Sequence, residues 1–481
     1  MQIIPRSSTR HSALLKPSCA LAAILALASG MLGPPAQAQI AVRNQGYMPF
    51  ADEPINYRSE DVNDPVATLQ KQLESGAAAL SFEADNGYLK SVLKVLKVPV
   101  ESQTLVFSKT SFQYPKISAD HPRALYFNDD VYVGKVHDGK AIEIVSFDAR
   151  QGAIFYLLDE RKVDKPVFQR AELDCTQCHI ASGTRGVPGV LLRSVCPNAS
   201  GTVVPGAPTY ITDQDSPVAE RWGGWYVSGK PGEATTSMAN AVVAESATTA
   251  TPGQAASSGK LEMLGRQTYQ AADYLVPGSD AVALLVLAHQ TQMHNLITLT
   301  NYKTRIGLYN LHRQAADGQA TGALLHDVAA PAFEKSAEQL LRYLLFANEA
   351  PLSGLDPQAL AESPFAREFA ARGLRDAAGR SLRDFDLKRR IFRYPCSYLI
   401  YSSAFDAIPE PAKSYVYHRL LQILTGQDQS DDFARLSAED RRAVLEIVLQ
   451  TKPGLPAEWQ EYAHATRLKI AAIDLQKGTT P

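Results

Sequence analysis

The segment C-T-Q-C-H at positions 175–179 constrains this chain more than any other part of its sequence. The spacing C-x-x-C-H is the attachment signature of a c-type haem. In such sites two thiols bond to the vinyl groups of one porphyrin, and the adjacent histidine donates an imidazole nitrogen to the iron. The motif predicts one covalently bound haem c, attached through Cys175 and Cys178 and ligated by His179. Zinc or a short disulfide is the weaker alternative, because no second C-x-x-C or Cys/His pair completes a four-ligand zinc site.

The first 38 residues have the pattern of a secretory signal peptide. Three basic residues accompany an apolar run over about 18–32, and A-Q-A at 36–38 supplies a small-x-small cleavage site. We therefore expect cleavage near Ala38 and an exported, periplasmic mature protein. Haem is attached to c-type cytochromes outside the cytoplasm, so the predicted location agrees with the motif.

The predicted mature chain is mildly acidic. Three of the 48 lysines and arginines lie in the first 38 residues, whereas none of the 50 acidic residues does, which leaves a net charge of −5. A chain without a basic excess is a poor nucleic-acid partner, because it cannot neutralise phosphates. No later apolar run is long enough to cross a bilayer, and the best, at 281–288, is far too short. The expected partner is a redox protein or a small-molecule electron donor or acceptor.

Two cysteines of the mature chain, Cys196 and Cys396, lie outside the motif. In an oxidising compartment they could form a disulfide. In the chain-entropy model, closure of a loop of about 200 residues stabilises a fold by on the order of 5 kcal/mol. The alternative is a pair of buried free thiols that pack as small apolar residues. The sequence leaves both alternatives open.

Hydrophobic periodicity predicts a sheet before the motif and helices after it. Two helices are expected first, over 66–73 and 88–96. Strands are expected at 104–108, 124–127, 131–133, 141–147 and 153–158, with turns that make a small antiparallel sheet. Residues 175–228 are loop-rich, and most of 234–259 has the composition of a flexible surface loop.

The sequence after residue 261 is expected to be almost wholly helical. Ser279 and Asp280 are candidate caps for a long helix that reaches Asn301, and Ser437 with Asp440 resembles a capping box. Further helices are predicted at 332–348, 364–373, 413–424, 438–451 and 457–475. The fold class is therefore α+β and mostly α. It divides into a signal peptide (1–38), an α+β region with the sheet (39–165), a loop-rich haem-binding region (166–260) and a helical region (261–481).

The sixth ligand of the iron separates electron carriers from catalysts, because an open position admits small substrates. Met238 is the leading candidate, since it follows His179 by about 60 residues and comes after an aromatic cluster at 221–226. Its alternative is a methionine in a loop. His289 shares a helix face with Met293, and His294 is one step round. These histidines either face the haem or are buried and hydrogen-bonded within the helices.

Two further kinds of contact are expected around the motif. A backbone carbonyl at Pro188 or Gly189 is placed to accept the proton of the second imidazole nitrogen, which would fix the ring. Arg185 and Arg193 are close enough in sequence to pair with the haem propionates. The alternative for each arginine is a loop side chain that faces water.

The motif and about fifty residues after it resemble c-type cytochromes. The mature chain is also similar to a group of exported monohaem c-type cytochromes of unassigned function. The segments with this similarity are LVFSKTS at 105–111, YFNDDVYVG at 126–134, GVPG at 186–189, ERWGGWYV at 220–227 and RYPCSY at 393–398. The group often has histidine at the positions of Gln214 and Ser237, so this chain departs from it there, while Met238 is present.

Three functions are compatible with this sequence. The first is a periplasmic electron-transfer cytochrome, against which the length of the chain counts. The second is a haem enzyme, a peroxidase or small-molecule oxidase with an open distal side, against which the lack of a recognisable acid/base constellation counts. The third is a binding module in which the haem is structural.

Overall fold

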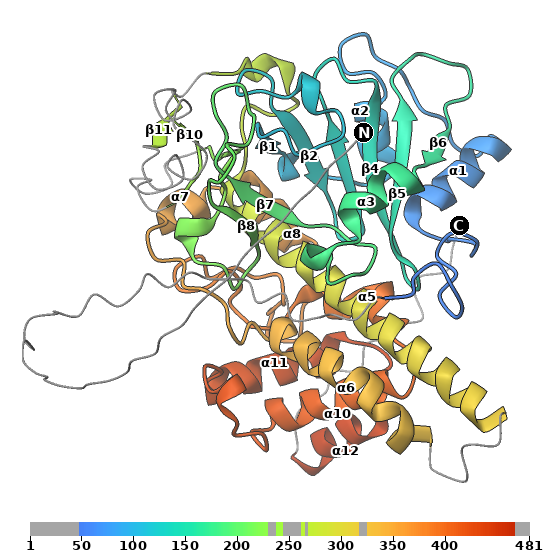
Figure 1. Ribbon diagram of the computed structural model, residues 1–481. Coiled ribbons are helices and arrows are strands. Elements are labelled where there is room, and N and C mark those ends of the chain that lie inside the picture. The colour runs from blue at the N-terminus through green and yellow to red at the C-terminus, as the bar shows by residue number, and fades with distance from the viewer. Residues whose placement is uncertain (1–47, 229–236, 244–260, 265–267, 317–324, 467–481) are drawn as a thin grey trace, which may run out of the picture. The chain divides into compact units, whose positions relative to one another are not determined.

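A seven-stranded antiparallel sheet, in the order β6-β5-β4-β3-β2-β1-β9, is the main β structure of the chain. Figure 1 shows the computed structural model, which describes residues 48–228, 237–243, 261–264, 268–316 and 325–466. The strands of this sheet are β1 (Thr104–Val106), β2 (Arg123–Phe127), β3 (Val131–Lys135), β4 (Ala141–Asp148), β5 (Gly152–Asp159), β6 (Phe168–Arg170) and β9 (Trp225–Tyr226). Two smaller sheets pair β7 (Leu192–Val195) with β8 (Thr209–Thr212), and β10 (Ala241–Val243) with β11 (Leu261–Met263).

The two faces of the large sheet bury different cores, because successive side chains of a strand point to opposite faces. On one face, Val133, Ile144 and Tyr156 follow one another across three paired strands. They share a core with residues of α1 (Pro65–Ser75) and α2 (Leu89–Val95). These two helices therefore cover that face.

The opposite face packs against the helical part of the chain. Phe147, Phe155 and Trp225 on this face share one core with Val286 and Ile297. These last two residues belong to α5, the longest helix described, which runs from the sheet toward α6 and α10 in Figure 1. The helices after the sheet are α3 (Glu172–His179), α5 (Ala281–Ala316), α6 (Leu325–Leu344), α7 (Pro357–Ala361), α8 (Pro364–Ala371), α9 (Ser403–Asp406), α10 (Ala412–Leu424), α11 (Ala438–Thr451) and α12 (Ala457–Ala465).

Helix α5 is buried on every side along its first 22 residues, 281–302. A helix buried all round lies in the core of a large protein. Its start is capped by Asp280, whose Oδ1 accepts hydrogen bonds from the backbone N–H groups of Val282 (2.8 Å) and Ala283 (3.0 Å). The Oδ2 atom of Asp280 accepts a further bond from the Ser363 hydroxyl at 2.7 Å. The cap therefore also fixes α5 to the segment before α8.

The α+β class predicted from the sequence is confirmed. All five predicted strands are present as β1 to β5, and the helix predicted over 438–451 has the bounds of α11. The predicted caps at Asp280 and Ser437 are also present, the latter through a hydrogen bond from the Asp440 N–H at 3.0 Å. These elements are set by local pattern, which the sequence displays directly.

Two short strands lie where the sequence did not predict them. β10 lies within the segment expected to be a loop, and β11 lies where helices were expected to begin. The two strands pair with each other across an intervening segment, so their pairing is a long-range feature that local pattern does not reveal. Helix α5 also continues to Ala316 rather than ending near Asn301, because its later turns leave the core and lose the apolar pattern.

The remaining organisational predictions are not decided by the fold. The described residues fall within one compact unit, and the predicted boundaries at 165 and 260 stay predictions. The predicted signal peptide, 1–38, lies outside the described residues. None of the described helices is both long and apolar enough to cross a membrane.

Candidate functional site

The C-x-x-C-H motif forms the last turns of α3, directly after β6. Cys175 and Cys178 are three residues apart and His179 is four from Cys175, so the three side chains lie on neighbouring positions of one helix surface. Cys175 is partly buried against the core beneath the sheet, whereas Cys178 is exposed, and neither forms a disulfide. The helix thus presents one exposed sulfur, one partly buried sulfur and one imidazole together.

The imidazole of His179 is held by the backbone of Gly189. Its Nδ1 lies 2.8 Å from the Gly189 carbonyl oxygen, which confirms the predicted contact. Because a carbonyl oxygen only accepts, Nδ1 is the protonated nitrogen, and in neutral imidazole Nε2 is then the basic one. No group in the described part of the chain hydrogen-bonds Nε2 of His179. This is the tautomer that a metal-ligating histidine requires.

The loop after α3 is fixed both to the motif and to α5. The Gly189 N–H donates to the His179 carbonyl at 3.0 Å, so one glycine holds both the ring and the backbone of this histidine. Asn295 on α5 holds the next residue, since its Oδ1 accepts from the Val190 N–H at 3.2 Å and its Nδ2 donates to the Val190 carbonyl at 2.7 Å. A Cβ at position 189 would collide with the side-chain amide of Asn295. Glycine is therefore needed at 189 for this close approach.

The other side of the imidazole meets the sheet. The Phe155 ring of β5 lies 4.9 Å from the His179 ring, centre to centre, at an interplanar angle of 49°. Burial lowers the pKa of His179, while the hydrogen bond to Gly189 acts in the opposite direction. Burial has the larger effect and the pKa is lowered, so the imidazole is neutral near pH 7 and able to donate a lone pair.

A buried ion pair on the same sheet face was not expected from the sequence. Arg123 of β2 pairs with Glu143 of β4, and both side chains are largely buried. Arg123 lowers the pKa of His179 and Glu143 raises it, which places both charges within electrostatic reach of the imidazole. The Nε atom of Arg123 is buried without a hydrogen-bond partner among the described residues. The sequence signal was a charged residue at an inward position of β2, on the face of Leu125 and Phe127.

The two arginines expected to meet propionates differ in surroundings. Arg185 faces α5, where its Nε donates to the Gln292 Oε1 at 3.3 Å. Its charge also lowers the pKa of Asp215, which burial raises to about 6. Arg193 is half-buried on β7, and its carbonyl accepts a hydrogen bond from Trp225 Nε1 at 2.8 Å. The propionate contacts of both side chains stay predictions.

Met238 lies in a small cluster of its own. It packs against Cys196, Val204 and Val243, and its sulfur accepts a hydrogen bond from the Ser194 hydroxyl at 3.7 Å. No hydrogen bond or ring contact in the described residues joins Met238 to His179. Its assignment as the sixth ligand therefore stays a prediction.

His289 is a buried, fully hydrogen-bonded histidine. Its Nδ1 lies 2.5 Å from Gln214 Oε1 and its Nε2 lies 2.8 Å from the Ser397 Oγ. The amide of Gln214 is oriented by a hydrogen bond from its Nε2 to the Tyr343 carbonyl at 3.0 Å. Both ring nitrogens of His289 are thus engaged, which fits the alternative of a histidine bonded within the helices. Burial, with a smaller contribution from His294, lowers its pKa to about 3.

His294 has one engaged nitrogen and one unpaired. Its Nε2 lies 2.8 Å from the Asp129 carbonyl, which fixes the proton on Nε2. Its ring stacks on Phe147 at 3.9 Å, and Nδ1 is buried with no partner among the described residues. Burial lowers the pKa of His294 to about 4. The ring is therefore a neutral part of the sheet–helix contact.

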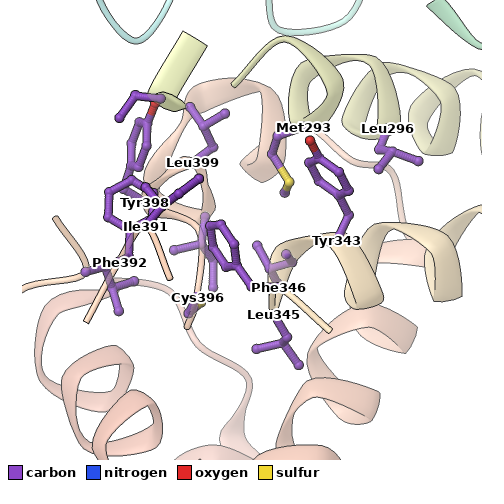
Figure 2. Close-up of a cluster of buried hydrophobic side chains, with 14 of the residues drawn as sticks. Met293, Leu296, Tyr343, Leu345, Phe346, Ile391, Phe392, Cys396, Tyr398 and Leu399 are labelled. Atoms are coloured by element: carbon purple, nitrogen blue, oxygen red, sulfur yellow. The ribbon is translucent and has the colours of Figure 1, made fainter. Parts of the chain in front are cut away.

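The two cysteines outside the motif are both buried and free. Cys196 packs in the Met238 cluster, whereas Cys396 belongs to the large core. Figure 2 shows Cys396 among Phe346, Phe392 and other side chains of that core, with Met293 nearby. The structure thus has the free-thiol alternative rather than a disulfide, and burial raises the pKa of both thiols.

A pocket of about 790 Å³ lies away from the motif. Its lining includes Leu69 of α1, Lys97 after α2 and Asp148 of β4, and contains none of the motif residues. The pocket is therefore separate from the residues predicted to bind haem.

Comparison of the chain with family models, with curated proteins and with solved structures gives no match in any of the three. The functional argument consequently depends on the residues of the site.

A double-mutant cycle tests the close contact at Gly189. Gly189→Ala should lower the free energy of unfolding by about 2 kcal/mol, because the added methyl overpacks the site against Asn295. Asn295→Ala should lower it by about 1–3 kcal/mol, since the Val190 backbone loses both partners. The double variant should lose at least about 1 kcal/mol less unfolding free energy than the two single variants lose together, because alanine at 295 removes the clash. Urea denaturation measures all four proteins, and additive losses would contradict this account of the glycine.

The buried neutral state of His289 predicts a pH effect. Its pKa is about 3 in the folded chain, against about 6.5 in an unfolded one, so acid protonates the unfolded state first. Between pH 7 and pH 5 this linkage should cost the wild type about 2 kcal/mol of unfolding free energy. His289→Gln keeps a donor and an acceptor but does not titrate. The difference in unfolding free energy between wild type and variant should therefore be about 2 kcal/mol smaller at pH 5 than at pH 7. If the two proteins lose unfolding free energy in parallel as the pH falls, His289 is not the source of the pH effect.

Proposed function

We propose that this chain is an exported c-type cytochrome that binds one haem c through Cys175 and Cys178, with His179 as the axial ligand, and transfers electrons. The observation that supports it most is the hydrogen bond from Nδ1 of His179 to the Gly189 carbonyl. It leaves Nε2 as the basic nitrogen on the same helix as the partly buried Cys175 and the exposed Cys178, neither of which forms a disulfide. A haem bound there would supply a one-electron iron centre.

The surrounding residues fit such a group in three ways. Gly189 fixes the imidazole plane, and a carbonyl partner raises the basicity of a ligating histidine. Phe155 covers one side of the ring and keeps water from it. Arg123 has a buried Nε without a partner in the described residues, so a further hydrogen-bond acceptor near this face would satisfy it.

A haem enzyme with an open distal side is the second candidate. The observation in its favour is that the sulfur of Met238 is engaged by Ser194 and packed against Cys196. His289 is also committed through both nitrogens. If Met238 keeps its present contacts, the iron would have no sulfur ligand, and small molecules could reach it.

Covalent attachment is tested by mass and colour. The full chain, produced in an exporting host with working cytochrome maturation, should be red and carry the added mass of one haem. A variant with both Cys175→Ala and Cys178→Ala should carry no covalent haem, because both thioether bonds are lost. Cys196→Ala is the matched control, since this thiol is buried in another cluster, and it should retain the haem. Wild-type protein at the bare polypeptide mass would refute the proposal.

Carbon monoxide distinguishes the two candidate functions. With Met238 as sixth ligand, the reduced wild type should show little change in its absorption spectrum, and Met238→Ala should bind carbon monoxide readily. Met263→Ala is the control, because this methionine is exposed and its removal should leave the wild-type spectrum unchanged. A wild type that binds carbon monoxide fully would favour the enzyme.

A further inference from the structure

Two histidines and an aspartate from three separate segments meet at one edge of the structure. The ligand atoms of His121, His137 and Asp273 all lie within 4.8 Å of one another. His121 and Asp273 are exposed and His137 is half-buried, so the group is open to solvent. This cluster takes no part in the site proposed for haem.

The sheet register brings the two histidines together. His121 lies just before β2 and His137 just after β3, and the two strands are antiparallel with Ala124 opposite Lys135. The start of one strand and the end of the other therefore lie at the same edge. The two rings stack with centroids 4.9 Å apart and planes 12° apart.

The segment that holds His121 is fixed on both sides of the histidine. The hydroxyl of Tyr226 donates to the Ala119 carbonyl at 2.8 Å, and that of Tyr274 donates to the Pro122 carbonyl at 2.8 Å. Tyr274 directly follows Asp273 in the chain, so the same bond joins the aspartate segment to the histidine segment. Metal sites gain affinity when their ligands are held in place before the ion binds.

The segment that holds His137 is a tight turn. The Gly139 N–H donates to the Val136 carbonyl at 3.0 Å, and a Cβ at 139 would come within 2.9 Å of that same oxygen. Asp138 lies within this turn, and its Oδ2 is 3.9 Å from Nε2 of His137. A second carboxylate is thus close to the same imidazole.

From this geometry we propose that His121, His137 and Asp273 form a binding site for a divalent transition-metal ion of the zinc class. Two imidazoles and one carboxylate are a donor set that such ions take in proteins, usually with a further position for water or a substrate. Ligand atoms at about 2.0–2.1 Å from one tetrahedral ion lie about 3.3 Å apart. The ligand atoms, which are at most 4.8 Å apart, therefore need to approach one another by at most about 1.5 Å. Exposed side chains achieve this by small rotations.

Zinc titration of the haem-loaded full chain tests the site. Isothermal calorimetry with ZnCl₂ should show one bound ion, and His137→Gln and Asp273→Asn should each weaken it by at least about tenfold. His418→Gln is the matched control, because His418 is an exposed histidine whose Nδ1 lies 2.9 Å from the Glu458 Oε2. That pair belongs to no group of three ligands in the described residues, so its loss should leave zinc affinity unchanged.

The motif thiols are the main competing ligands, and two measurements separate them from this site. Zinc binding should persist in a Cys175→Ser, Cys178→Ser variant, whether or not that variant holds haem. Co²⁺ in place of zinc should give a spectrum without a thiolate charge-transfer band. Zinc binding that survives both His137→Gln and Asp273→Asn, or that is lost with the two cysteines, would overturn this proposal and leave that for haem untouched.

Discussion

Side chains of one buried helix fix the motif loop and the sheet relative to each other. Asn295 bonds both backbone groups of Val190, Gln292 donates to the Gly183 carbonyl at 2.9 Å, and Gln290 donates to the Asn128 carbonyl at 2.7 Å. Buried polar groups are costly unless they are paired. Because α5 is buried on every side over 281–302, its amides need partners, and those of Asn295, Gln292 and Gln290 find them in the loop after α3 and the turn between β2 and β3.

The motif needs this external support because α3 has little stability of its own. It has eight residues, and its N-cap position, Ala171, offers no side-chain hydrogen bond. Isolated helices of this length are unstable in water. The orientation of the His179 ring is therefore imposed by two groups outside the helix. These are the Phe155 ring on β5 and the Gly189 carbonyl in the loop after α3. Because these contacts act on His179 alone, they fix the imidazole and leave the two cysteine side chains of the helix unobstructed by them.

The features predicted from the sequence are those that depend on near neighbours. Strands β1 to β5 show alternation, α11 has a capping serine, and the Gly189 carbonyl is only ten residues from the ring that it holds. The features that were missed or left open depend on distant partners. The role of His289 is set by Gln214 and Ser397, residues 75 and 108 positions away, so no local pattern distinguishes it from a ligand. The pairing of Arg123 with Glu143 likewise follows from sheet register, which the sequence does not specify.

The contacts of Met238 are compatible with electron transfer in the proposed cytochrome, provided that its side chain rotates toward the haem. Its backbone N–H is bound to the Arg221 carbonyl at 3.1 Å, and Arg221 is itself buried and donates to the Ser216 and Gln214 carbonyls. The side chain is held less firmly, because a thioether accepts only weak hydrogen bonds and methionine adapts its shape easily. A firm backbone with an adaptable sulfur suits a ligand that reaches a cofactor by side-chain rotation. An enzyme would also need an acid or base near the iron. Both ring nitrogens of His289 and Nε2 of His294 are bound within the fold, and Nδ1 of His294 is buried, so these histidines are committed to packing rather than to an open site.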